Sequence, residues 1–227
     1  MKIAILGTGS VGQTWATKLV SLNHFVTIGT RNTENTLAKL NNGVATFAEF
    51  MKNNATVELK NYNEAVLNAD IVINATKGEA SIAALQAVGS ALDGKIIIDI
   101  ANPLDFSAGA GYPSLIPSLS NTTSLGEEIQ KTFPTTKVVK TLNTMWAGLM
   151  VNPNMTANGD HTNFICGNDA EAKTTVKDLI KSFGWTDTSI LDLGDLSNAR
   201  GTEAVLPIWL RVWGATQNGA FNIKIVS

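Results

Sequence analysis

Short runs of apolar residues alternate along the chain with longer segments whose apolar residues recur at helical spacing. The runs, together with one alternating segment, predict strands at residues 1–6, 25–28, 56–60, 70–76, 95–100 and 137–142. The segments between them predict helices at residues 14–22, 33–40, 45–52, 64–68, 79–92 and 124–133. Strands that alternate with helices form βαβ units with right-handed crossovers. We therefore predict an α/β fold with a doubly wound parallel sheet.

The chain after residue 145 has a pattern of its own. We expect strands at 162–167 and 188–193, separated by an amphipathic helix that begins at Asp169. A bulky apolar helix from 196 to 219 should be kinked at Pro207, and residues 221–226 should be extended. Such a bulky helix is more typical of a core or a dimer interface than of a ligand pocket, and a homodimer is therefore one of the two possibilities that it suggests. The predicted organisation is a domain of residues 1–145 and a small C-terminal α/β lobe of residues 146–227.

Residues 104–121 form a long stretch rich in glycine, proline and serine. A loop of this length inside a compact chain is usually functional. Phe106, Tyr112 and Leu115 are apolar residues that could anchor it. The stretch therefore resembles a lid more than a disordered linker.

Composition narrows the class of protein. Hydrophobic residues make up 44% and charged residues 16%, which is typical of a globular protein with a sizeable core. A net charge of -2 gives no electrostatic reason to expect binding to nucleic acid or to an anionic membrane. The single cysteine, Cys166, lies in an apolar strand and the two histidines are far apart, so we expect no metal centre. Without a membrane-spanning segment or a signal peptide, we expect a cytoplasmic protein.

The pattern G-x-G-x-x-G lies between the first strand and the first helix, which is the context that makes it informative. Gly7 permits the tight turn, Gly9 lets a pyrophosphate approach the backbone, and Gly12 lets the helix pack on the strand. The free N–H groups of the helix N-terminus attract phosphate. The motif predicts dinucleotide binding by a Rossmann-type fold, with these contact residues: Gly7, Thr8, Gly9, Ser10, Val11 and Gly12.

The end of the second predicted strand distinguishes the two nicotinamide dinucleotides. An acidic residue there would bind the ribose 2′-hydroxyl of NAD. This chain instead has Thr30 and Arg31, a hydroxyl and a guanidinium that suit the 2′-phosphate of NADP. We therefore predict NADP, the alternative being that Arg31 is only a solvated residue at a strand end.

Ligands of doubly wound sheets lie beyond the carboxyl ends of the strands. Ala75, Thr76 and Lys77 follow one strand, and Asn102 and Pro103 follow the next. Lys77 either reaches a phosphate or ribose or faces water. Asn102 and Pro103 are expected near the nicotinamide, although Asn-Pro is also a common turn.

The chain contains no credible catalytic dyad. No Tyr-x-x-x-Lys pair occurs, because the residue four positions after Tyr62 is Val66 and the residue four positions after Tyr112 is Ile116. Hydride transfer between two rings needs no nucleophile, only a cofactor and a substrate held face to face. Asn143 or Arg200 could orient a small substrate, but a salt bridge at the start of a helix explains Arg200 equally well.

Five segments, in this order, resemble the coenzyme F420-dependent NADP oxidoreductases: GTGSVG, IGTRN, VKTLNTM, FICGND and DLGDLSNARGTEAVLPIWL. The family's modules also resemble the cytosolic domains of membrane metalloreductases. The resemblance implies a Rossmann domain with a small C-terminal domain, and a 2′-phosphate held by Thr8, Thr30 and Arg31. It also implies that backbone from Met145 to Ala147 holds the nicotinamide, that the deazaflavin stacks over it, and that the protein is a dimer.

Three differences from the family's sequences affect the identity of the second substrate more than the binding of NADP. Asn143 stands where the archaeal enzymes have a histidine, Asn35 replaces a basic residue, and the loop of residues 104–121 is longer. We predict an NADP-dependent oxidoreductase that exchanges a hydride with a deazaflavin (F420) or a flavin. The alternatives are an NADPH-sensing module without turnover and a reductase of a small imine or carbonyl compound.

Overall fold

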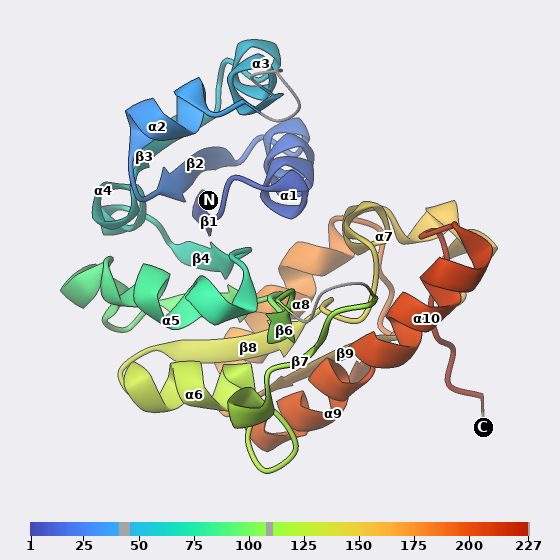
Figure 1. The fold of residues 1–227 in the computed structure, drawn as a ribbon. Helices are drawn as coiled ribbons and strands as arrows, with labels where there is room; N and C mark the ends of the chain where they lie inside the picture. The colour runs from blue at the N-terminus through green and yellow to red at the C-terminus, as the bar shows by residue number, and fades with distance from the viewer. Residues whose placement is uncertain (41–45, 108–110, 227) are drawn as a thin grey trace.

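The computed structural model describes residues 1–40, 46–107 and 111–226 (Figure 1). Eight of their strands form one sheet in the order β10-β9-β8-β5-β4-β1-β2-β3. Neighbouring strands are parallel except β8 and β9, which are antiparallel. The bounds are β1 Lys2–Leu6, β2 Phe25–Thr30, β3 Glu58–Asn61, β4 Ile71–Asn74, β5 Ile96–Asp99, β8 Lys137–Thr141, β9 Asn163–Gly167 and β10 Ile190–Asp192. The predicted doubly wound α/β fold is confirmed.

Helices cover both faces of this sheet (Figure 1). The α-helices are α1 Ser10–Ser21, α2 Thr33–Ala38, α3 Thr46–Asn53, α4 Tyr62–Leu67, α5 Gly78–Gln86, α6 Leu125–Thr132, α7 Ala147–Val151, α8 Ala170–Lys181, α9 Ala199–Ala204 and α10 Leu206–Thr216. The predicted helix at 79–92 is divided, because α5 ends at Gln86 and a short 3-10 helix, η1 (Gly89–Leu92), follows. The predicted break at Pro207 is confirmed, because α10 begins one residue before it.

Alternate residues of the strands face opposite cores. In β1, Ile3 and Ile5 pack with α1, α7 and α8, whereas Ala4 and Leu6 pack with α4, α5 and α6. This period of two on strands that are buried on both sides explains why the runs are apolar throughout. Burying one such aliphatic side chain stabilises the fold by about 1.5–3 kcal/mol.

The strands of the predicted C-terminal lobe continue the main sheet. Strand β9 pairs with β8, and β10 pairs with β9, so residues 163–192 extend the sheet by two strands. Asp169 caps α8 by accepting a hydrogen bond from the Ala172 N–H at 2.8 Å, as expected. The division after residue 145 stays a prediction. None of the helices in the described residues is long and apolar enough to cross a membrane.

The stretch at 104–121 contains a small antiparallel hairpin of β6 (Leu104–Asp105) and β7 (Ser114–Leu115). Residues 108–110, within the predicted lid, lie outside the described residues. The tail at 221–226 contains no strand, although the Thr162 N–H donates to the Ile223 carbonyl at 2.8 Å.

A buried lysine connects the sheet to the C-terminal helices. Lys140 of β8 is fully buried, and its ammonium donates to Asp99 of β5 at 2.9 Å and lies 2.8 Å from Glu203 of α9. Glu203 in turn accepts from the backbone N–H groups of Leu125 and Gly126 at the start of α6. Burial alone would lower the pKa of Lys140, but the two carboxylates raise it above its ordinary value.

Replacing this lysine should therefore destabilise the fold strongly. Lys140→Met leaves Asp99 and Glu203 buried without a counter-charge, and we expect a loss of about 3–5 kcal/mol of unfolding free energy. The matched control is Lys173→Met, which removes an ion pair with the partly exposed Asp192 and should cost at most about 1 kcal/mol. Urea unfolding measures both values, and equal losses would contradict the role given to Lys140.

Candidate functional site

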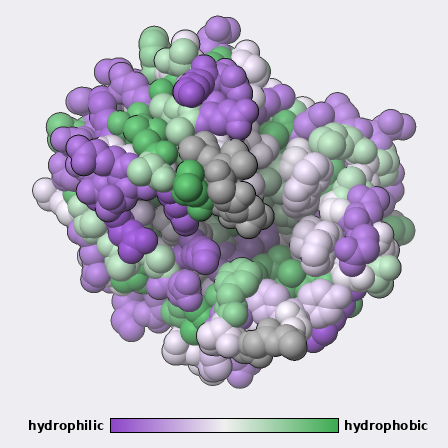
Figure 2. All heavy atoms as spheres, turned by 45° about the horizontal axis from the view of Figure 1, so that its top comes forward, coloured by the Kyte–Doolittle hydropathy of each residue, from purple (hydrophilic) through white to green (hydrophobic). Residues whose placement is uncertain are grey.

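The parallel strands β1, β2, β4, β5 and β8 end along one edge of the sheet. The pairing of Leu6 with Asn74, of Asn74 with Asp99 and of Asp99 with Lys140 places the ends of β1, β4, β5 and β8 in register, with β2 beside β1. The residues predicted from strand ends therefore belong to one edge (Figure 1). In the view of Figure 2, the surface of the molecule is hollowed.

The glycine loop has the geometry of a phosphate cradle. Gly7 has a φ of +125°, and a Cβ there would collide with the Ala75 carbonyl. A Cβ on Gly12 would collide with the Gly7 carbonyl, whereas one on Gly9 would meet nothing within 4 Å. Gly9 is the N-cap of α1, which has neither a side-chain cap nor an acidic residue in its first turn. These features fit a phosphate at the N–H groups of α1.

The end of β2 presents a cation. Arg31 is exposed, and none of the ion pairs found among the described residues includes it. The Thr30 hydroxyl is nearly buried and shares a 2.7 Å hydrogen bond with the Thr36 hydroxyl. Asn35 stands where the family has a basic residue. Its backbone N–H donates to the side-chain oxygen of Asn32 at 2.7 Å. Arg31 is thus the better placed of the two predicted residues to meet a 2′-phosphate.

Buried polar side chains stabilise the turn after β4. Asn74 donates to Asp99 at 2.9 Å and accepts from the Thr76 hydroxyl at 2.7 Å. Ala75 packs against Gly7 of the glycine loop. Lys77 is exposed, and its ammonium lies 5.5 Å from the centre of the Phe106 ring. The hairpin thus contacts the turn that follows β4.

The ends of β5 and β8 are joined by two amides. Asn102 donates to the Asn143 carbonyl at 2.8 Å, and Asn143 donates to the Asn102 side-chain oxygen at 2.9 Å. Pro103, Met145 and Ala147 are buried beyond these strands. The structure therefore brings Asn102 and Asn143 into contact, and the nicotinamide contacts stay a prediction.

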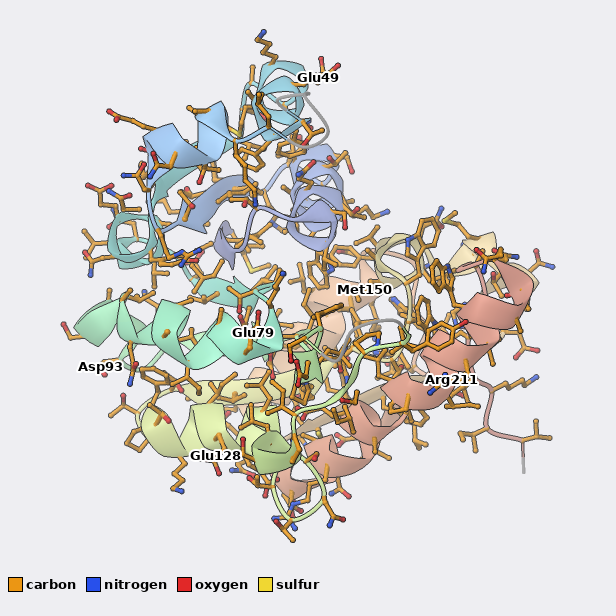
Figure 3. All side chains as sticks on the ribbon, in the orientation of Figure 1. Glu49, Glu79, Asp93, Glu128, Met150 and Arg211 are labelled. Carbon is orange, nitrogen blue, oxygen red and sulfur yellow. The ribbon has the colours of Figure 1, made fainter. Side chains whose placement is uncertain are left out.

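The β6–β7 hairpin connects this edge to α10. Its Tyr112 ring lies 4.6 Å from the guanidinium of Arg211. The Tyr112 hydroxyl occupies the place that a Cβ on Gly214 would take. Arg211 on α10 and Glu79 on α5, both labelled in Figure 3, lie on opposite sides of the hairpin. The expected lid therefore has one anchor on each side, Phe106 at Lys77 and Tyr112 at Gly214.

Two further side chains have clear surroundings in the structure. Arg200 forms a two-pronged salt bridge with Glu127 of α6, with Nε to Oε2 at 2.8 Å and Nη2 to Oε1 at 2.6 Å, which is the salt bridge that the sequence offered as one of its two explanations. Burial raises the pKa of the Cys166 thiol to about 12, which makes it unreactive. No group of three or more potential metal ligands occurs within residues 1–40, 46–107 and 111–226.

Sequence reasoning missed two features: the buried ion pairs of Lys140 with Asp99 and Glu203, and the notch at Gly214, which is the space beside its Cα that the Tyr112 hydroxyl fills. A lysine inside the apolar strand KVVKT is a signal for a buried charge, since an unpaired ammonium is rarely buried. Gly214 carries no such signal, because its partner Tyr112 lies far away in the chain.

Residues 2–103 match the model of a family described as "NADP oxidoreductase coenzyme F420-dependent". A solved structure from Arthrobacter sp. FB24, a candidate F420-dependent NADP-reductase, is 52% identical, with a TM-score of 0.94 and 100% coverage of both chains. The chain belongs to the family of F420-dependent NADP oxidoreductases. It is thus an oxidoreductase of an NADP(H)-binding family, as predicted.

More distant relatives match over most of this chain. The F420-dependent NADP reductase of Methanocaldococcus jannaschii is 28% identical over 92% of this chain and 90% of its own length. The metalloreductase STEAP3 of Rattus norvegicus is 30% identical over 92% of this chain, which spans only 38% of that protein. An imine reductase of Streptomyces aurantiacus, 13% identical with a TM-score of 0.60 over 94% of this chain and 62% of its own, shares the fold.

The notch at Gly214 allows a sharp test of the hairpin's anchorage. Alanine normally stabilises a helix by about 0.5–1 kcal/mol relative to glycine. Gly214→Ala should instead displace Tyr112 and increase the rate of chymotrypsin cleavage after Phe106 severalfold; the bond after Tyr112 is resistant because Pro113 follows it. The control is Gly201→Ala in α9, where a Cβ meets nothing within 4 Å. Equal cleavage rates for both variants would show that Tyr112 does not anchor the hairpin.

Proposed function

We propose that this oxidoreductase transfers a hydride between NADP(H) and a deazaflavin (F420) or flavin-type acceptor. The observation that carries the proposal is the arrangement along one sheet edge. The cation Arg31 after β2, the open glycine loop after β1 and the turns after β4, β5 and β8 follow one another along the edge, in the order in which a dinucleotide would meet them from its 2′-phosphate to its nicotinamide. The family to which the chain belongs supports the same cofactor.

The site residues take distinct roles in this proposal. The loop of residues 7–12 binds the pyrophosphate, and Thr8, Thr30 and Arg31 bind the 2′-phosphate. The turns after β4 and β5 line the cofactor with Ala75, Thr76, Lys77, Asn102 and Pro103. The backbone of Met145 and Ala147 holds the nicotinamide, and Asn143 lies at the same end.

Bound NADP supplies the hydride chemistry, and the protein supplies orientation. No catalytic nucleophile is needed, because reacting carbons held about 3–3.5 Å apart with aligned faces already gain much of the rate. The described residues of the hairpin and α10 form the opposite side of the acceptor site.

We also propose that α10 forms a homodimer interface. Its Ile208 and Trp213 are 56% and 40% exposed, large values for apolar side chains on one helix. The molar mass in solution tests this assembly.

The 2′-phosphate assignment predicts a preference between cofactors. NADPH should bind more tightly than NADH, because only NADPH offers a phosphate to Arg31. Arg31→Ala should weaken NADPH binding by about tenfold or more and leave NADH nearly unchanged. Calorimetric titration measures the four dissociation constants. A suitable control is Lys52→Ala, a change on α3 that should leave the preference intact. Equal affinities of the unmutated protein for both cofactors would refute the assignment.

The acceptor is tested by turnover. NADPH should be oxidised steadily with F420, FMN or FAD, and slowly or not at all with a cyclic imine or a ketone. Nicotinamide absorbance reports the rate with each compound. Tight NADPH binding without turnover on any acceptor would favour a sensing module, and turnover only on the imine or ketone would favour a small-substrate reductase.

A further inference from the structure

The turn after β8 has an unusual backbone. Leu142 is buried and has a φ of +58°, a left-handed conformation that side-chain-bearing residues rarely adopt. Such a residue costs about 1–3 kcal/mol and persists where its surroundings enforce it. Here the Leu142 N–H donates to the Asn163 side-chain oxygen at 3.1 Å, while the Asn163 amide donates to the Thr141 hydroxyl at 2.9 Å. The strain coincides with the turn into Asn143 and Thr144.

The hydrogen bonds determine how the Asn143 amide is oriented. Asn102 donates its NH2 group to the Asn143 backbone carbonyl, so its side-chain oxygen must be the acceptor in the other bond. Asn143 therefore donates its own NH2 group to Asn102. What remains is the Asn143 Oδ1, an acceptor without a hydrogen-bond partner in the described part of the chain.

The next residue has a second orphaned group. Thr144 Oγ1 is also buried and has no partner within the described residues, and both residues are only 1% exposed. Buried polar atoms nearly always have partners, because leaving one unsatisfied costs about 1–3 kcal/mol. An orphaned acceptor and an orphaned hydroxyl on consecutive residues, at a strained turn, point to a ligand that supplies both partners.

We propose that Asn143 and Thr144 bind the primary carboxamide of the nicotinamide ring. The carboxamide NH2 group donates to Asn143 Oδ1, and the Thr144 hydroxyl donates to the carboxamide oxygen. This inference rests on the proposed function, in which NADP(H) lies along this edge with its nicotinamide at β8.

The chemistry of the two groups fits a primary amide. A ketone or a carboxylate has no N–H to offer Asn143 Oδ1, whereas a primary amide presents a donor and an acceptor on one carbon. Both protein groups are buried in this structure, so the proposal requires neighbouring residues to move when the carboxamide binds. The two residues thus discriminate nicotinamide dinucleotides from analogues that lack the amide.

The test combines protein variants with a cofactor analogue. The ligands are NADP⁺, its 3-acetylpyridine analogue, in which a methyl ketone replaces the amide, and 2′,5′-ADP, which contains only the adenosine half. Calorimetry gives each dissociation constant. The unmutated protein should bind NADP⁺ about tenfold or more tightly than the analogue. Asn143→Leu should abolish this ratio, because only the amide loses a partner.

Thr144 provides a matched pair of variants. Thr144→Val should weaken NADP⁺ and its analogue together by about tenfold, since both retain the carbonyl. Thr144→Ser keeps the hydroxyl and should bind as the unmutated protein does. Binding of 2′,5′-ADP should be unchanged in every variant, which confirms that each is folded.

Each outcome separates this inference from the proposed function. If 2′,5′-ADP and NADP⁺ both fail to bind the unmutated protein, the proposed function and this inference fall together. If 2′,5′-ADP binds but NADP⁺ and the acetylpyridine analogue bind equally, only this inference is overturned. An unchanged ratio in Asn143→Leu, or full NADP⁺ affinity in Thr144→Val, overturns it as well.

Discussion

The ammonium of Lys140, buried between Asp99 and Glu203, is the interaction on which the rest of the arrangement depends. It joins two neighbouring strands to α9, and through Glu203 it reaches the backbone N–H groups at the start of α6. It also donates to the Ala101 carbonyl, just before the turn that carries Asn102. Two buried carboxylates without this cation would repel each other, so the sheet edge and the C-terminal helices are assembled together.

The site has two ends with different demands. The phosphate end is made by backbone: a turn that only glycine permits at Gly7, and a helix N-terminus without a competing acid. The nicotinamide end is made by side chains in the turn after β8. Hydrogen bonds to the side-chain amides of Asn102 and Asn163, which are far from this turn in the sequence, hold it in place. Tight phosphate binding needs only a cradle, whereas hydride transfer needs a ring held in one orientation.

The sequence predicts those parts of the molecule whose signal is local. The strands, the glycine loop, the cap at Asp169 and the break at Pro207 each follow from a few consecutive residues. The role of Lys140, the left-handed Leu142 and the fit of Tyr112 against Gly214 depend on partners far away in the chain. The same limit applies to β9 and β10, because an apolar strand has the same pattern whichever sheet it joins.

The central claim is that one sheet edge binds NADP along its whole length, from Arg31 to the turn after β8. Amide hydrogen exchange with and without NADP⁺ tests it most directly. The account predicts that NADP⁺ slows exchange in three separate segments, residues 7–12, 30–36 and 142–147. Exchange in α8, which packs on a face of the sheet and not at its edge, should change little. Protection confined to one of these segments, or located elsewhere, would contradict it.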